Sequence, residues 1–185
     1  MRTNVGGLDS RGFALLEVLI TAGLVVGIAA GASQIVAIAI RASHGARVRT
    51  MSTLLAAEKM EQLRSLAWTH TTTSSPAISI SSSDVTTDLS SDPANDAGPG
   101  LLTSPAGTLQ ANVPSYVDYL DGDGRWLGRG AAPPTSAVYI RRWAVQPLAS
   151  DPDNILVFHV VVTTRATNGA VSPDAAMLAS IEARK

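Results

Sequence analysis

Residues 12–18 read Gly-Phe-Ala-Leu-Leu-Glu-Val, and they open a long apolar run that continues to Ile40. Glu17 is the only charged side chain between residues 13 and 40. A helix over this run would be roughly 42 Å long at ~1.5 Å per residue, which exceeds the ~30 Å hydrocarbon core of a bilayer. We therefore predict a membrane-compatible helix over residues 13–40, preceded by a polar leader at residues 1–12.

The carboxylate of Glu17 needs an explanation, because a charge in lipid costs at least ~2.5 kcal/mol and such residues have a partner or a function. An ordinary single-span anchor is the plainest interpretation of the segment. A secretory signal cleaved after residues 30–32, Ala-Gly-Ala, is a second one. The apolar run argues against cleavage there, because it exceeds the usual ~7–15 residues and continues past that site.

At these residues the chain resembles the type IV prepilin family. The resemblance covers residues 11 to about 40 most closely, and it implies cleavage between Gly12 and Phe13 by a prepilin peptidase that also methylates the new amine of Phe13. Glu17 then becomes the fifth residue of the mature chain, where the family has its glutamate. The implied partners are this peptidase/methyltransferase, other pilins or pseudopilins, and the inner membrane. A hydrogen-bonded pair between the cationic amine and Glu17 would offset much of the desolvation of both charges.

The basic residues around the apolar run do not by themselves give its orientation. Arg2 and Arg11 precede the run, whereas Arg41, Arg47 and Arg49 follow it, so the positive-inside rule alone would place the C-terminal side in the cytoplasm. The resemblance implies the opposite orientation. We expect a single-pass protein of the bacterial inner membrane with a periplasmic C-terminal domain, which enters a pilus or pseudopilus after assembly.

Gly23, Gly27 and Gly31 recur every four residues and share one helix face. Such a face lets another helix approach closely, so we assign these glycines to assembly together with Glu17. The alternative is that glycine is simply more frequent in membrane helices than in soluble ones. The proline that often kinks the helix of family members is replaced here by Gln34.

The helix is expected to continue as an amphipathic segment over residues 41–68, since no proline occurs before Pro76. Apolar side chains on one side of this segment are expected to be covered by a sheet: Val48, Met51, Leu55, Ala56, Met60, Leu63, Leu66 and Ala67. Residues 69–110 then form a variable loop rich in Ser, Thr and Pro. Within that loop, Ile78, Ile80 and Val85 are expected to lie on one short strand.

The last part of the chain, residues 111–185, predicts an antiparallel sheet. The β-branched and aromatic segments at 137–145 and 155–164 read as strands, residues 151–154 as the turn between them, and 177–183 as a final strand. Trp143 is expected to face the amphipathic helix. The fold class is therefore α+β, with a long N-terminal helix packed on a small antiparallel sheet, similar to a pilin.

Three carboxylates in the segment 118–124, Asp-Tyr-Leu-Asp-Gly-Asp-Gly, suggest a calcium loop, with Asp118, Asp121 and Asp123 as weak candidate ligands. The spacing lacks the remaining ligands of an EF-hand. We favour a hairpin turn with exposed aspartates and predict no metal site.

Composition excludes several functional classes. A net charge of -1 gives no case for a nucleic-acid partner, and the absence of cysteine removes thiol catalysis and disulfides. Because many major pilins close a C-terminal loop with a disulfide, the resemblance favours a minor pilin or a pseudopilin. No nucleophile stands with a recognisable base, and no cofactor motif occurs, so we predict that the chain is not an enzyme.

Two functions remain open from the sequence. The first is a structural subunit of a type IV pilus or a type II secretion pseudopilus, with roles in secretion, adhesion or motility. The second is an uncleaved membrane anchor that presents a periplasmic β-domain as a binding module.

Overall fold

The computed structural model describes residues 10–66, 68–70, 80–83, 99–165 and 176–183. The chain forms two compact units, Met1–Ala46 and Arg47–Lys185. The helix α1 (Ser10–Ser65) contributes residues to both. The strands are β1 (Trp68–His70), β2 (Ile80–Ser83), β3 (Val117–Leu120), β4 (Trp126–Arg129), β5 (Tyr139–Pro147), β6 (Ile155–Thr164) and β7 (Ala176–Ala183).

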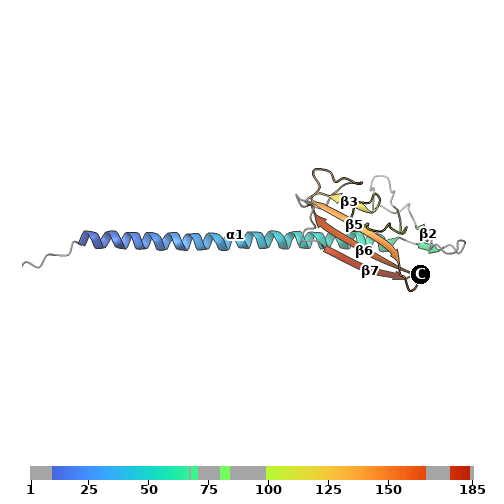
Figure 1. The fold of residues 1–185 in the computed structure, drawn as a ribbon, viewed down its shortest axis with the longest axis horizontal. Coiled ribbons are helices and arrows are strands. Elements are labelled where there is room, and N and C mark those ends of the chain that lie inside the picture. The colour runs from blue at the N-terminus through green and yellow to red at the C-terminus, as the bar shows by residue number, and fades with distance from the viewer. Residues whose placement is uncertain (1–9, 67, 71–79, 84–98, 166–175, 184–185) are drawn as a thin grey trace, which may run out of the picture. The chain divides into compact units, whose positions relative to one another are not determined.

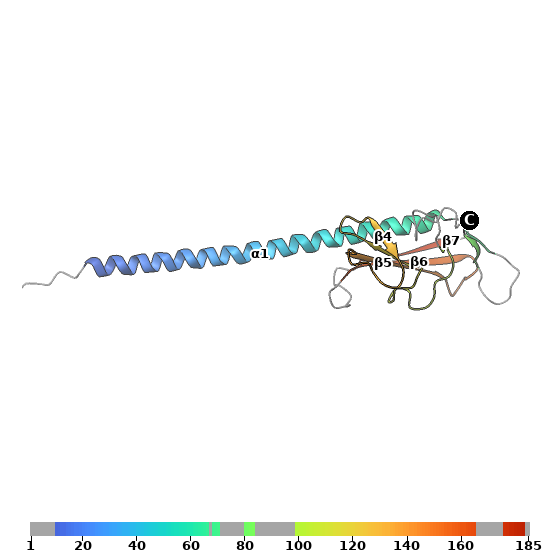
Figure 2. The ribbon, with the colours of Figure 1, turned by 90° about the horizontal axis from the view of Figure 1, so that it is seen from above.

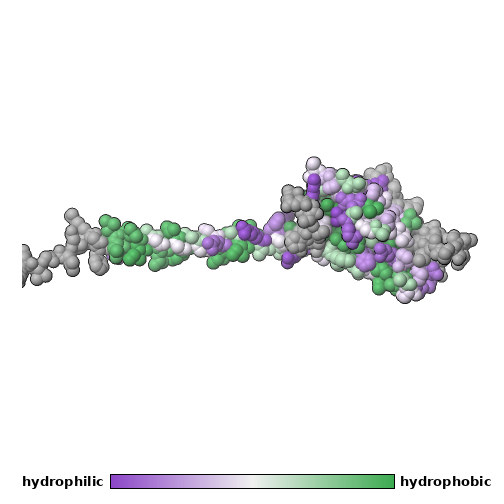
Figure 3. Space-filling view, in the orientation of Figure 1, coloured by the Kyte–Doolittle hydropathy of each residue, from purple (hydrophilic) through white to green (hydrophobic). Residues whose placement is uncertain are grey.

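The first unit consists, in its described part, of the N-terminal portion of α1. Every side chain between residues 15 and 44 is exposed, and the apolar ones form the green surface along the helix in Figure 3. The helix begins at Ser10, so the last residues of the predicted leader are helical. Residues 1–9 of that leader lie outside the described residues.

The second unit is built on a five-stranded sheet with the strand order β4-β3-β5-β6-β7. All neighbouring strands in this sheet are antiparallel. The strand predicted at residues 155–164 is present as β6 with the same bounds. The two strands predicted on either side of it are β5 and β7, with bounds shifted by one or two residues. The last three strands therefore form the expected meander, whereas β3 and β4 add a hairpin beside β5.

The C-terminal part of α1 lies along one face of this sheet, as Figures 1 and 2 show from two directions. The predicted apolar side of the helix faces the sheet: Leu55, Ala56, Met60, Leu63 and Leu66 are buried in the core, and Val48 and Met51 pack against it. From the sheet, alternate residues of β6 and the predicted Trp143 fill the same core. Ala67 lies outside the described residues.

The other face of the sheet is covered in part by a smaller apolar cluster of Val117, Tyr119, Ala137 and Ile140, with Leu127 packed against it. At the β7 edge this face remains open. Met177 and Ile181 are 60% and 64% exposed.

The segment after α1 differs from the sequence prediction. The helix ends at Ser65, and Trp68–His70 forms β1, which pairs with β2. Residues 69–110 are therefore not wholly a loop, since β1 reaches into this range and β2 lies within it. Ile80 opens β2, while Ile78 and Val85 lie outside the described residues.

Candidate functional site

The predicted processing site lies at the beginning of α1. Gly12 and Phe13 both have helical backbone, and the side chain of Phe13 lies outside the described part of the chain. Glu17 follows one turn later with an exposed side chain. Its backbone carbonyl accepts a hydrogen bond from the Thr21 hydroxyl at 2.9 Å. Among the described residues, no cation lies within ion-pair distance of its carboxylate.

The three predicted assembly glycines have no packing role inside the chain. A Cβ atom added at Gly23, Gly27 or Gly31 would meet no atom within 4 Å. Each glycine in a helix interior costs roughly 0.8–1.0 kcal/mol relative to alanine. Contacts within the described chain do not offset this cost.

One helix of the described chain is long and apolar enough to cross a membrane. By length and composition alone this is weak support for a span. The exposure of the apolar side chains adds a physical argument, because large contiguous apolar surfaces on soluble proteins are rare.

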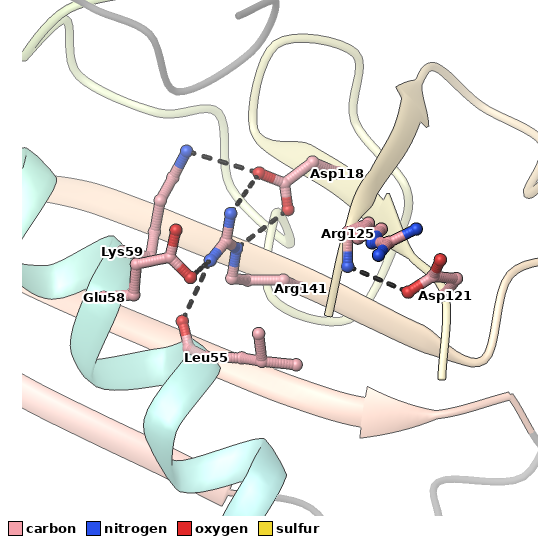
Figure 4. A network of polar contacts seen from close by, with 7 residues as sticks. All are labelled: Leu55, Glu58, Lys59, Asp118, Asp121, Arg125 and Arg141. Atoms are coloured by element: carbon pink, nitrogen blue, oxygen red, sulfur yellow. Dashed lines mark hydrogen bonds and ion pairs between the residues drawn. The ribbon is translucent and has the colours of Figure 1, made fainter. Parts of the chain in front are cut away.

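The second unit contains a buried ionic network between α1 and the sheet, which Figure 4 shows in close-up. The Asp118 carboxylate on β3 accepts hydrogen bonds from Nε and Nη2 of Arg141 on β5, both at 3.0 Å. This fork-to-carboxylate pairing is among the strongest hydrogen-bond geometries in proteins. Nη1 of Arg141 donates to the Leu55 carbonyl at 3.0 Å and to Glu58 at 3.2 Å.

Lys59 completes this network from the helix. Its Nζ lies 3.5 Å from Oδ2 of Asp118 and 3.4 Å from the centroid of the Trp143 ring. The side chains of Lys59 and Asp118 are fully buried, which is unusual for lysine unless the charge is paired. An aromatic face attracts a desolvated cation, so Trp143 and Asp118 together hold the ammonium.

The charges of the network offset one another. Burial alone would lower the pKa of Arg141, but the attraction of Asp118, hydrogen bonding to it and the further contribution of Glu58 outweigh this and raise the pKa above its usual value. Arg141 therefore stays cationic at any physiological pH. The network ties α1, β3 and β5 into one core and has the features of a structural site.

The structure separates the three candidate calcium ligands. Asp118 is buried in β3 and paired with Arg141, so the prediction that it is exposed in a turn is wrong. Asp121 lies in the β3–β4 turn, where its Oδ1 accepts hydrogen bonds from the backbone amides of Asp123 and Arg125, both at 2.9 Å. Among the described residues, no group of three or more acidic or histidine side chains is placed to share a metal ion.

The hairpin turn predicted here is present, and it packs on α1. Gly124 has φ +83, and a Cβ atom there would lie 2.6 Å from Cε of Met51 and 3.0 Å from Cδ2 of Leu55. Glycine is therefore required at this position for its backbone conformation, and the space beside it is tight.

The sequence prediction missed the network residues Lys59 and Asp118. Lys59 shares the helix face of Ala56 and Leu63. This helical spacing could have predicted that Lys59 is buried. Arg141 and Arg142 are consecutive residues of β5, so their side chains lie on opposite faces of the sheet. Arg141 faces α1, while Arg142 donates from Nε to Asn112 at 2.9 Å.

A comparison with protein-family models, with curated proteins and with solved structures finds no match for this chain.

Proposed function

We propose that the chain is a pilin-like structural subunit that prepilin peptidase cleaves between Gly12 and Phe13. The mature protein assembles through α1 into a type IV pilus, as a minor pilin, or into a type II secretion pseudopilus. Before assembly, α1 holds the subunit in the inner membrane, and the second unit lies in the periplasm.

The observation that carries this proposal is Glu17, a lone carboxylate in an apolar helix. No described residue of the chain pairs with it, so its partner is expected to come from elsewhere. Cleavage after Gly12 would supply an ammonium group at Phe13, four residues before Glu17. In an assembled filament the amine of the same subunit or of a neighbour can pair with the carboxylate, which couples assembly to charge neutralisation.

The exposed apolar side chains of α1 support the same proposal. Leu24, Val25 and Ile28 are 60–65% exposed in the single chain. Lipid can cover them before assembly, and helices of neighbouring subunits can cover them afterwards. Gly23, Gly27 and Gly31 would let such helices approach closely, because small residues favour helix–helix packing in membranes.

The second unit needs no further subunit to cover the C-terminal part of α1. The sheet buries that part of the helix, and the ionic network fixes it to β3 and β5.

Mass spectrometry of the protein from its native membranes tests the proposal. The expected mature N-terminus is N-methylated Phe13. Gly12→Leu should block processing, because the peptidase must accept a side chain at the cleavage position, whereas Gly7→Leu within the leader is the matched control and should leave processing intact. A wild-type protein that retains residues 1–12 would instead be an uncleaved anchor that presents a binding module, and the proposal would be wrong.

A further inference from the structure

The five-stranded sheet ends in two edge strands, β4 and β7, that differ in length and regularity. β4 has four residues, its register against β3 is irregular, and it ends in Arg129. Short length, irregular pairing and basic side chains are features that keep the edge of a sheet from pairing with another chain. β7 has eight residues, an unbroken register with β6, and no proline, lysine or arginine. The β7 edge therefore lacks the protection that the β4 edge has.

The hydrogen bonds of the sheet show which backbone groups of β7 face outward. The amide of Leu148 donates to the Ile155 carbonyl at 2.9 Å, in the register of the β5–β6 ladder. Because successive residues of an antiparallel strand direct their backbone groups to opposite sides, odd-numbered residues of β6 bond to β5 and even-numbered ones to β7. Phe158 lies opposite Ser180, so the even-numbered residues of β7 bond to β6. The outward-facing amides and carbonyls belong to three alternate residues: Met177, Ala179 and Ile181.

These outward backbone groups have no hydrogen-bond partner among the described residues. The side chains of the same three residues are exposed on the outer face of the sheet, and those of Met177 and Ile181 are large and apolar. Val157 and Val161, which are half-buried on β6 opposite Ile181 and Met177, continue this apolar face. The β7 edge thus combines unpaired backbone donors and acceptors with an apolar strip beside them.

The spacing of the unpaired groups identifies the kind of ligand. Donors and acceptors recur at every second residue, which corresponds to roughly 6.8 Å along an antiparallel strand. An extended polypeptide repeats its own backbone groups at the same interval. In strand addition, main-chain hydrogen bonds give affinity and alternate side chains give specificity. On β7 the small Ala179 lies between Met177 and Ile181, so it leaves room for a large apolar side chain on the opposite strand.

We propose that β7 is a site of strand addition, at which an extended segment of a second protein joins the sheet antiparallel to β7. The segment carries apolar side chains at the alternate positions that lie beside Met177, Ala179 and Ile181. The choice of a different protein, and not a second copy of this chain, rests on the proposed function. A β7–β7 pair of two copies would be isologous and closed, whereas the subunits of a filament are joined by heterologous contacts.

Hydrogen exchange of the purified full-length chain in detergent micelles tests whether the edge is free. The amides of Met177, Ala179 and Ile181 should exchange more than about tenfold faster than those of Leu178 and Ser180, which bond to β6. Equal protection of the two sets would mean that the chain or a second copy already covers the edge. The inference would then be wrong.

Photo-cross-linking in cells tests the binding itself. The full-length chain carries p-benzoylphenylalanine in place of Met177, and the cross-linked peptides are sequenced by mass spectrometry. The expected product joins β7 to one segment of another protein, with apolar residues at alternate positions. Absence of a cross-link, or a product of two copies of this chain, would overturn the inference.

A pair of substitutions at Ala179 tests the role of the backbone. Ala179→Pro removes one outward N–H and keeps the ladder with β6, because proline is tolerated on an edge strand whose N–H faces solvent. The yield of the cross-link should fall about tenfold, the factor for one lost hydrogen bond. Ala179→Val keeps the N–H and is the matched control, which should retain the yield. A yield that survives Ala179→Pro would remove the proposed hydrogen bonds.

A second pair of variants decides if Ala179→Pro lowers the melting temperature of the second unit. Ile181→Lys adds a charge on an exposed side chain beside the added strand, and the yield of the cross-link should fall several-fold. Its control is Leu54→Lys, on a similarly exposed apolar residue of α1 beside the β3–β4 turn. Equal yields from these two variants would contradict strand addition at β7.

The inference and the proposed function fail in different experiments. A leader retained in cells contradicts the proposed function but leaves the cross-link measurable, because β7 lies entirely in the second unit. Conversely, a protein with methylated Phe13 whose β7 gives no cross-link contradicts only the strand addition.

Discussion

The two parts of α1 are apolar in different ways. Between residues 15 and 40 every side chain is exposed, whereas between residues 52 and 66 one side is buried and the other is mostly polar, with Leu54 as its exposed apolar residue. The same contrast holds for two carboxylates, since Asp118 is held by Arg141 and Lys59 while Glu17 has no partner among the described residues. The comparison teaches that the C-terminal part of the helix finds its partner within the chain. For the N-terminal part, the proposed function assigns a partner outside the chain.

The largest expected effect comes from a substitution in the buried ionic network. Asp118→Asn removes the anion between Lys59 and Arg141 and leaves two buried cations without it. Removing one partner of a buried pair costs about 3–5 kcal/mol, and we expect the free energy of unfolding of the second unit to fall by that amount in chemical denaturation. Asp123→Asn, on an exposed carboxylate in the same hairpin, is the control and should change it by less than ~0.5 kcal/mol. Similar losses in Asp118→Asn and Asp123→Asn would show that the buried network does not stabilise the second unit.

A smaller effect is expected where the hairpin meets the helix. Gly124→Ala places a Cβ atom at a positive φ and against Met51, and the left-handed conformation costs an L-residue about 1–2 kcal/mol. The matched control is Gly122→Ala, whose Cβ would lie 3.9 Å from Val138 in ordinary contact. Denaturation midpoints of the two variants provide the measurement. A loss in Gly122→Ala as large as that in Gly124→Ala would contradict the assigned backbone requirement.

Lys59→Met tests whether the buried ammonium of Lys59 is needed for stability, as the carboxylate of Asp118 is, or is only tolerated. Asp118 keeps both of its hydrogen bonds to Arg141 in this variant, and methionine can still pack against Trp143. We therefore expect a loss of no more than ~1 kcal/mol, because buried ionic groups can often be replaced by apolar ones at little cost. The test measures the free energy of unfolding of Lys59→Met at equilibrium and compares it with that of Asp118→Asn. A loss equal to that of Asp118→Asn would show that the Lys59 ammonium is needed as much as the Asp118 carboxylate, which would contradict the expectation that it is only tolerated.

The smallest effect is a decline of stability in alkali. Burial raises the pKa of both Tyr119 and Tyr139 above the usual 10.0, so the unfolded chain loses these protons first as the pH rises. The stabilisation is complete below pH ~10 and is lost as the pH rises through the folded-state pKa values. Unfolding followed at several pH values should therefore be level from neutral pH to about 9 and then decline. Tyr139→Phe should reduce the slope with which the free energy of unfolding declines above pH ~9. An unchanged slope would contradict the raised pKa of Tyr139.

Periodicity in the sequence was enough to predict the elements whose partners are local or regular. β6 was predicted from its run of β-branched and aromatic residues, and the buried side of α1 was predicted from the helical spacing of its apolar residues. The pairing of Trp68–His70 with Ile80–Ser83 was not predicted, since β1 and β2 are short and each forms only against the other.

The ionic network escaped prediction for a related reason. Asp118 precedes a glycine-rich turn in sequence and therefore reads as part of it. Its partner Arg141 is 23 residues away and Lys59 is 59 residues away. Only the assembled sheet brings these charges together, and rules of charge and exposure for single residues place all three at the surface.

Assembly of the Glu17→Val variant tests the central contrast most directly. Filaments are sheared from cells and sedimented, and the yield of subunit in the pellet is measured together with the N-terminal mass. We predict normal removal of residues 1–12 and loss of the subunit from the pellet, while Glu61→Val, on the exposed side of the C-terminal part of α1, assembles normally. If Glu17→Val subunits enter filaments at the wild-type yield, the carboxylate needs no partner outside the chain and the account is wrong.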